Sequence, residues 1–168
     1  GVIGIISVKK HLHDTDILHE LSALKKVSKL CRCENDKKNK IRGPFLALVS
    51  MDSFEKKEKC TEEWIYEKML SVYDFKEDYF DDLIGYIGAL SKWSIFKKRP
   101  NKDGNAKYIF FEHKDDEQHM GFQFVLTGLL SVYYDETRNY ISRPGFTSFP
   151  SNRKYDKCLG EIETKGIR

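Results

Sequence analysis

Residues 73–93 read YDFKEDYFDDLIGYIGALSKW, and the interpretation of this stretch decides which fold the rest of the chain can form. Its apolar residues recur three or four positions apart, which is the spacing of a helix with one buried face. The apolar positions are Phe80, Leu83, Ile84, Ile87 and Leu90. The pattern predicts a helix that begins near residue 80.

Carboxylates crowd the loop before this predicted helix and its first turn. Negative charge is favourable there because it meets the positive end of the helix dipole. The acids therefore fit two interpretations: the solvated start of a surface helix, or an acidic surface that binds a partner. The acidic residues are Asp74, Glu77, Asp78, Asp81 and Asp82.

The composition is typical of a globular chain with a hydrophobic core. Of the 168 residues, 40% are apolar and 13% aromatic, which suffices for one domain and an extension. No apolar run approaches the ~20 residues needed to cross a bilayer, and the start of the chain lacks the flanks of a signal peptide. We therefore expect a cytoplasmic protein without membrane contacts. The four cysteines are few for a disulfide framework, so reduced thiols are expected.

Charge is segregated along the chain, although the total is only +3. The net charge is +5 for residues 1–43, −5 for residues 44–93 and +3 for residues 94–168. An acidic middle between basic ends argues against one continuous nucleic-acid surface. It favours a local acidic surface with its own partner.

The elements on either side of residues 73–93 follow from periodicity and turn chemistry. For residues 122–134 a strand remains an alternative to a helix, because Gly121 and Gly128 each weaken a helix by ~1 kcal/mol. In chain order, we expect a strand at 1–8, a helix at 14–30, a basic loop at 33–42, a strand at 45–51, a helix from Thr61 toward residue 73, the acidic helix, a strand at 107–113, a helix at 122–133 and a short edge strand within 140–149.

This order predicts an α/β fold with a small, mostly parallel, three-stranded sheet packed with helices. We expect three regions. Residues 1–43 form a basic N-terminal extension with a strand and a helix, residues 44–149 form the α/β domain, and residues 150–168 form a C-terminal tail.

Three segments resemble the barstar-like ribonuclease inhibitors, a family of immunity proteins. LSVYDFKEDYFDDLIGYIGALSKW at 70–93 is similar to the family's helix, aromatic loop and acidic helix. KYIFFEH at 107–113 resembles its middle strand, and GFQFVLTGLLSVYYDE at 121–136 resembles its last long helix. The Gly-x-Asn step that the family usually has between the aromatic pair and the acidic helix is missing here. The resemblance covers about residues 44–149.

The resemblance implies a protein that binds and inhibits a basic nuclease or toxin protein. Carboxylates on a stiff element can fill an active site built to hold phosphates. On this interpretation two aromatic residues shape the loop, the acids face the nuclease, and Glu112 adds a contact at the edge. The implied partner-binding residues are Asp74, Asp78, Tyr79, Phe80, Asp81, Asp82, Tyr86 and Glu112.

Two other functions remain open on the sequence. Lys97, Lys98 and Arg99 lie among aromatic residues and could contact nucleic acid by charge and stacking. Glu163 and Lys165 have the Glu-x-Lys spacing that metal-dependent nucleases use on a strand.

No cofactor or metal is predicted, and an enzymatic activity is not expected. Whether His11, His13, Cys31 and Cys33 bind a metal stays open, because structural zinc sites usually have two or more residues between paired cysteines. The oligomeric state is not predicted.

Overall fold

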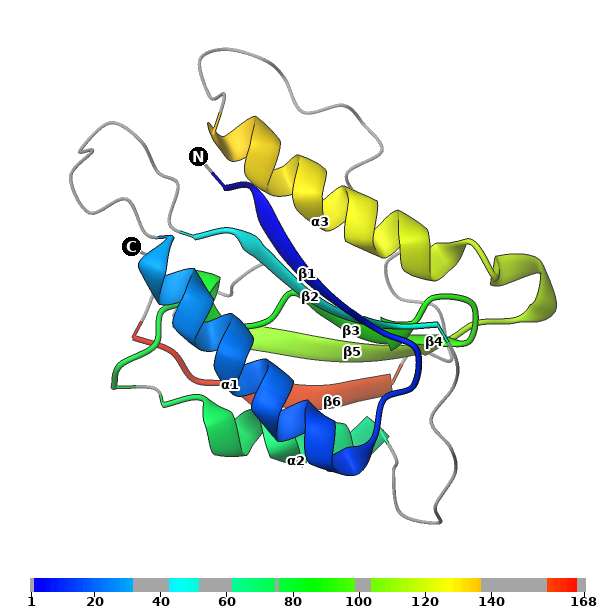
Figure 1. Ribbon diagram of the computed structural model, residues 1–168, viewed down its shortest axis with the longest axis horizontal. Helices are drawn as coiled ribbons and strands as arrows, with labels where there is room; N and C mark the ends of the chain where they lie inside the picture. The colour runs from blue at the N-terminus through cyan, green and yellow to red at the C-terminus, as the bar shows by residue number, and fades with distance from the viewer. Residues whose placement is uncertain are drawn as a thin grey trace.

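A computed structural model describes residues 2–31, 43–51, 62–74, 76–98, 104–136 and 157–165. These residues form one mixed six-stranded sheet covered by helices on both faces (Figure 1). The strands follow one another across the sheet in chain order. They are β1 (Gly4–Lys9), β2 (Phe45–Ser50), β3 (Tyr86–Ala89), β4 (Trp93–Lys97), β5 (Ala106–Glu112) and β6 (Lys157–Ile162).

The sheet has a parallel half and an antiparallel half. β1, β2 and β3 run parallel, whereas β4, β5 and β6 each run antiparallel to the preceding strand. Parallel neighbours need crossover helices, and antiparallel neighbours can be joined by turns. The helical elements are α1 (Asp14–Leu30), α2 (Glu62–Val72), the 3₁₀ turns η1 (Phe80–Asp82) and η2 (Asp115–Glu117), and α3 (Met120–Glu136).

The two crossover helices, α1 and α2, cover one face of the sheet, and α3 covers the other (Figure 1). Both crossovers advance in the same direction, and right-handed crossovers then place their helices on the same face. Alternate residues of β2 serve the two cores: Leu46 and Leu48 face α1 and α2, whereas Ala47 and Val49 face α3.

The glycines of α3 are explained by its close approach to the sheet. A Cβ at Gly128 would lie 2.2 Å from the ring of Phe45, and a Cβ at Gly121 would lie 2.3 Å from the carbonyl oxygen of Leu90. Phe124 stacks on Phe96 with ring centroids 4.6 Å apart. The helix is therefore favoured by packing at the two positions where its propensity is lowest, and the alternative of a strand at 122–134 is wrong.

The predicted helix that begins near residue 80 is wrong. The chain makes only the short turn η1 there and then enters β3, which is followed by a turn and by β4. All four residues of β3 are buried. A strand buried on both faces has no polar alternation, so its apolar residues can imitate helical spacing. Close packing within β3 explains the glycine at position 88, because a Cβ there would lie 2.5 Å from the hydroxyl of Tyr86.

The α/β class is confirmed. Among the described residues, however, the sheet has six strands and combines parallel with antiparallel pairs. The predicted extension and the predicted tail both contribute to it, since β1 pairs with β2 and β6 pairs with β5. The strands expected at 45–51 and 107–113 and the helices expected at 14–30, 61–73 and 122–133 are confirmed within a few residues. The edge strand expected within 140–149 lies outside the described residues.

Candidate functional site

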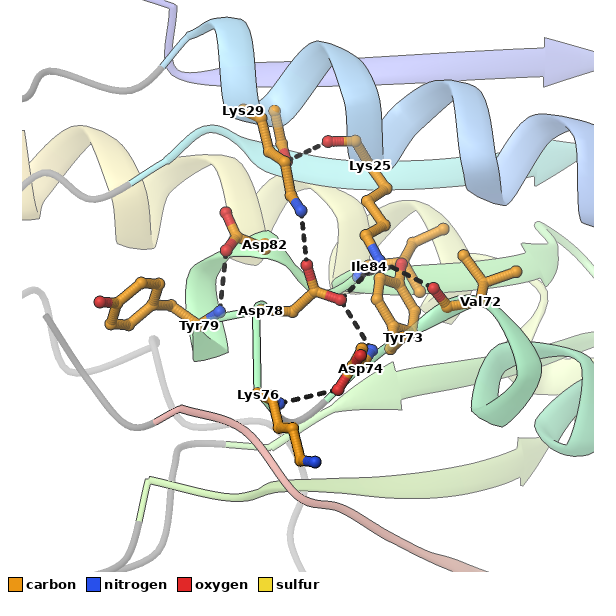
Figure 2. A network of polar contacts seen from close by, with 11 residues as sticks. Lys25, Lys29, Val72, Tyr73, Asp74, Lys76, Asp78, Tyr79, Asp82 and Ile84 are labelled. Carbon is orange, nitrogen blue, oxygen red and sulfur yellow. Dashed lines mark hydrogen bonds and ion pairs between the residues drawn. The ribbon is translucent and has the colours of Figure 1, made fainter.

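The loop between α2 and β3 contains most of the predicted partner-binding residues, and its centre is a buried carboxylate. The side chain of Asp78 is only 1% exposed. Its Oδ2 lies 2.6 Å from Nζ of Lys25, and its Oδ1 lies 2.9 Å from Nζ of Lys29. The backbone N–H of Asp74 also donates to Oδ2, at 2.8 Å. We call these four residues the Asp78 network (Figure 2).

The Asp78 network ties the loop to α1, more than forty residues away in the chain. Lys25 and Lys29 are one helical turn apart and therefore reach the same carboxylate from the same side of α1. Lys25 Nζ donates in addition to the carbonyl oxygen of Val72, the last residue of α2, at 2.8 Å. A cation at that position also meets the negative end of the α2 dipole.

The carboxyl of Asp78 is ionised at neutral pH despite its burial. Burial alone would raise its pKa, because a charged group loses hydration in the interior. Hydrogen bonds from Asp74 N–H and from the two ammonium groups outweigh burial and hold the pKa of Asp78 below its usual range. The carboxylate is thus fully engaged inside the protein.

A second acidic residue of the loop, Asp82, is also turned inward. Its Oδ2 accepts a hydrogen bond from the backbone N–H of Tyr79 at 2.8 Å, which closes a capping box around η1 (Figure 2). Tyr73 then accepts from the N–H of Ile84 at 2.9 Å, and Tyr108 donates to the carbonyl of Ile84 at 2.7 Å. Burial raises the pKa of the Tyr73 hydroxyl well above its ordinary value.

Lys97, at the end of β4, holds the end of the loop in place. Its Nζ donates to the carbonyl oxygens of Phe80 and Leu83, each at 2.7 Å, and lies 4.2 Å from the centre of the Phe80 ring. Burial lowers the pKa of Lys97 to about 8, against the smaller opposing effect of Asp81 and Asp82. This lysine caps the carbonyl end of η1 and does not offer its charge to an external partner.

The structure therefore divides the predicted partner-binding residues. Asp78, Asp82 and Tyr86 are buried, and Asp81, Tyr79 and Phe80 are half-buried. Asp74 is exposed, and so is Glu77, which belongs to the same acidic run.

Glu112 is exposed but does not join the loop. It pairs in register with Trp93, which pairs with Ala89 at the carboxyl end of β3. The loop enters β3 at the opposite end of that strand. The contact surface predicted from the loop and Glu112 together is therefore not assembled on one side of the chain.

The residues of the alternative functions are also placed. Lys97 is engaged with the loop, Lys98 is half-buried, and Arg99 lies outside the described residues. Glu163 and Lys165 follow β6, and Lys165 Nζ lies 5.3 Å from the centre of the Tyr79 ring. Within the described part of the chain, no three His, Cys, Asp or Glu side chains gather as metal ligands. His11 and His13 have ring centroids 6.4 Å apart, Cys31 is half-buried, and Cys33 lies outside the described residues.

Two polar clusters were not predicted from the sequence. Ser94 Oγ lies 2.8 Å from Nε2 of His113 and 3.0 Å from the hydroxyl of Tyr86. A serine beside a histidine can act as a nucleophile, but Ser94 is completely buried, so this arrangement has no path to a substrate. The hydroxyls of Ser94 and Tyr86 are hydrogen-bonded within this cluster, on the side of the sheet that α3 covers.

The second cluster joins β1 to α1. Glu20 accepts a hydrogen bond from Ser7 Oγ at 2.7 Å and pairs with Lys9 Nζ at 2.7 Å. The hydrogen bond from Lys9 is the main cause that lowers the pKa of Glu20. The signal for this cluster in the sequence is the alternation of Ser7 and Lys9 along a strand, which places both on one face.

No family model, curated protein or solved structure matches the chain. No helix among the described residues is long and apolar enough to cross a membrane.

Proposed function

We propose that the chain acts by binding a protein, as an immunity-type inhibitor of a basic nuclease or toxin. The observation that supports the proposal is the construction of the loop after α2. Its buried acids hold the backbone in place, while Asp74 and Glu77 remain exposed. The described residues of the loop thus offer carboxylates beside backbone groups that the buried acids already hold.

Order before binding matters for affinity. A flexible acidic loop loses conformational entropy when it binds, whereas an ordered loop has lost that entropy on folding. Complementary charge also steers the encounter, and it raises the association rate more than it slows dissociation. The Arg, Lys and His side chains of a nuclease site would bind the carboxylates of such a loop as they bind phosphate.

The residue roles differ from those that the resemblance implies. Asp74 and Glu77 contact the partner in this proposal, and Asp81 contributes at the edge of the contact. Asp78 and Asp82 act as positioning residues, because both are buried, Oδ2 of each accepts a backbone hydrogen bond, and Oδ1 of Asp78 pairs with Lys29.

Binding to a panel of basic bacterial ribonucleases, measured by surface plasmon resonance, tests the proposal. We expect the double variant Asp74→Asn/Glu77→Gln to reduce the association rate about tenfold at low salt, with a smaller effect at high salt. Asp115→Asn/Asp116→Asn is the matched control, since both residues are exposed and the charge change is the same.

Equal losses in the two double variants would reduce the effect to net charge and contradict a specific acidic site. Binding of single-stranded RNA in place of any ribonuclease would favour the nucleic-acid alternative. Mg²⁺-dependent cleavage that is lost in Glu163→Ala would favour the nuclease alternative.

A further inference from the structure

We infer that the outer edge of β1 is a second binding surface, where an extended strand of a partner protein adds to the sheet. The inferred ligand is a segment with apolar side chains at every second position and polar ones between. This surface is independent of the acidic loop.

The backbone of β1 has half of its hydrogen-bonding groups directed outward. Ile3 O accepts from Phe45 N at 2.9 Å, and Lys9 O accepts from Met51 N at 3.1 Å. In a parallel ladder the residues that bond to the neighbour alternate, so positions 3, 5, 7 and 9 face β2. The N–H and C=O groups of Gly4, Ile6 and Val8 therefore point away from it. Among the strands that the structure describes, β1 is at the edge of the sheet.

The side chains along this edge are apolar and exposed. Ile6 is 41% exposed and Val8 is 61% exposed. Edge strands of soluble proteins are usually protected by charges, proline or a covering element. The only charged side chain of β1 is that of Lys9, at its last position. No described strand pairs with this edge, and a strand edge with these side chains is the kind of surface to which another strand adds.

Helix α3 adds exposed apolar side chains on the same face of the sheet. A Cβ on Gly4 would lie 2.1 Å from Leu129, so the later part of α3 lies over the start of β1, and the helix runs antiparallel to the strand (Figure 1). Phe122 and Leu126, which precede Leu129 on that side of α3, are 62% and 44% exposed. Ile6 and Val8 lie on the sheet face that α3 covers, since they alternate with Ser7, whose side chain bonds to α1. Exposed apolar side chains on the strand edge and on the helix of the same face favour an interaction site here.

On the side of the sheet that faces α1, β1 carries the polar side chains of Ser7 and Lys9. These define the ligand residues expected on that side. Ser7 and Lys9 bind Glu20 there, Asp16 adds negative charge near Lys9, and Lys10 follows as an exposed cation. We choose an antiparallel ligand strand, because antiparallel pairing is slightly more stable per residue, and such a strand would begin beside Lys10. We therefore expect valine or isoleucine facing α3, threonine facing α1, and one carboxylate at the amino end.

The probe is a fluorescein-labelled eight-residue peptide that alternates valine or isoleucine with threonine and begins with aspartate. Its control has the same composition, with the apolar residues placed together. Anisotropy should show binding of the alternating peptide at least about tenfold tighter than the control peptide. Loop variant Asp74→Asn/Glu77→Gln should bind the peptide unchanged, so that failure of the acidic site and failure of this edge can be told apart.

Val8→Pro removes one outward N–H without removing a bond to β2, and proline is tolerated at strand edges. It should weaken peptide binding at least about tenfold, whereas Val8→Ala, which keeps the N–H, should weaken it less. Phe122→Ser should also weaken binding. Leu70→Ser is the matched control, since Leu70 is exposed on α2 at the opposite face. Thermal melting of each variant confirms folding.

Hydrogen exchange gives a readout that simple adhesion would not. On peptide addition the amides of Ile6 and Val8 should become protected, whereas those of Ser7 and Lys9 should change little. Equal binding of the two peptides, or protection without this alternation, would overturn the inference. A dimer of the chain that Val8→Pro converts to monomer, with no peptide binding, would assign the edge to a second copy and overturn the inferred partner.

Discussion

Replacement of Asp78 by asparagine tests whether the acidic loop is built from inside. Asparagine has nearly the same shape and can still accept the hydrogen bond from the N–H of Asp74. It cannot neutralise Lys25 and Lys29, which lie 2.6 and 2.9 Å from the carboxylate oxygens. The variant therefore removes two ion pairs and keeps the packing.

The size of the effect follows from how well each lysine can return to water. The side chain of Lys25 is 16% exposed and that of Lys29 is 32% exposed. Removal of one partner from a fully buried ion pair costs about 3–5 kcal/mol, and a partly exposed pair costs less because the remaining charge rehydrates. We expect Asp78→Asn to lower the free energy of unfolding by about 3 kcal/mol, mostly through Lys25.

Urea denaturation of wild type, Asp78→Asn, Lys29→Met and the double variant measures this coupling. The double variant should be more stable than the sum of the single losses predicts, because no lysine at position 29 is then left beside a neutral amide. A loss below about 1 kcal/mol for Asp78→Asn would refute the reasoning and return Asp78 to the set of partner-binding candidates.

The same difference should depend on pH with a definite sign. The pKa of Asp78 is lower in the folded chain than in the unfolded chain, so the carboxylate stabilises the fold above its unfolded pKa of about 4. The advantage of wild type over Asp78→Asn should therefore be constant near neutral pH. It should disappear as the pH falls through the depressed folded value.

Two further predictions concern Lys97, which holds the end of the loop, and Gly160 of β6, at the edge of the sheet opposite to β1. Lys97 has a folded pKa of about 8 against 10.5 in the unfolded chain, so the unfolded chain binds more protons between these values. Relative to Lys97→Met, the urea-derived stability of wild type should rise by up to about 1.4 kcal/mol per pH unit between pH 8 and 10, and a flat difference would contradict the burial of its ammonium. Gly160 has φ of 149°, and a Cβ there would lie 2.5 Å from the hydroxyl of Tyr66. Gly160→Ala should lower the melting temperature through a loss of about 1–3 kcal/mol. Tyr66→Phe in the same chain should recover only part of it, because Cζ of the ring stays 2.8 Å from the new Cβ and the backbone strain remains; full recovery would show that contact with the hydroxyl is the whole effect.

Most elements could be predicted because their signals are local. The helix at 14–30 has a polar start and an apolar stripe, and the strands at 45–51 and 107–113 are short apolar runs. The predicted tail carried no local signal that it supplies a strand to the sheet. Pairing of β6 with β5 depends on contacts across more than forty residues, and the mostly polar composition of the tail did not predict a strand there.

The acidic run shows why the site was harder to predict than the fold. A carboxylate in sequence carries no mark of burial, and Asp78 is buried only because Lys25 and Lys29 reach it from α1. The helical spacing from Phe80 to Leu90 was equally ambiguous, because a strand enclosed by helices on both faces needs no polar positions. Both errors have one cause: burial is set by contacts between segments distant in the chain, which a local sequence pattern does not record.

Helix α1 connects the two proposed binding surfaces and also keeps them separate. Glu20, near its middle, binds Ser7 and Lys9 of β1, whereas Lys25 and Lys29, toward its end, bind the loop. Each surface is thus fixed to the same rigid helix through different side chains, with no shared charge pair. Loss of the Asp78 network should therefore lower the stability of the whole chain without changing the geometry of the β1 edge. On the two proposals, one copy of the chain binds a partner strand at β1 and a basic partner at the loop at the same time, because neither contact requires the other to be broken.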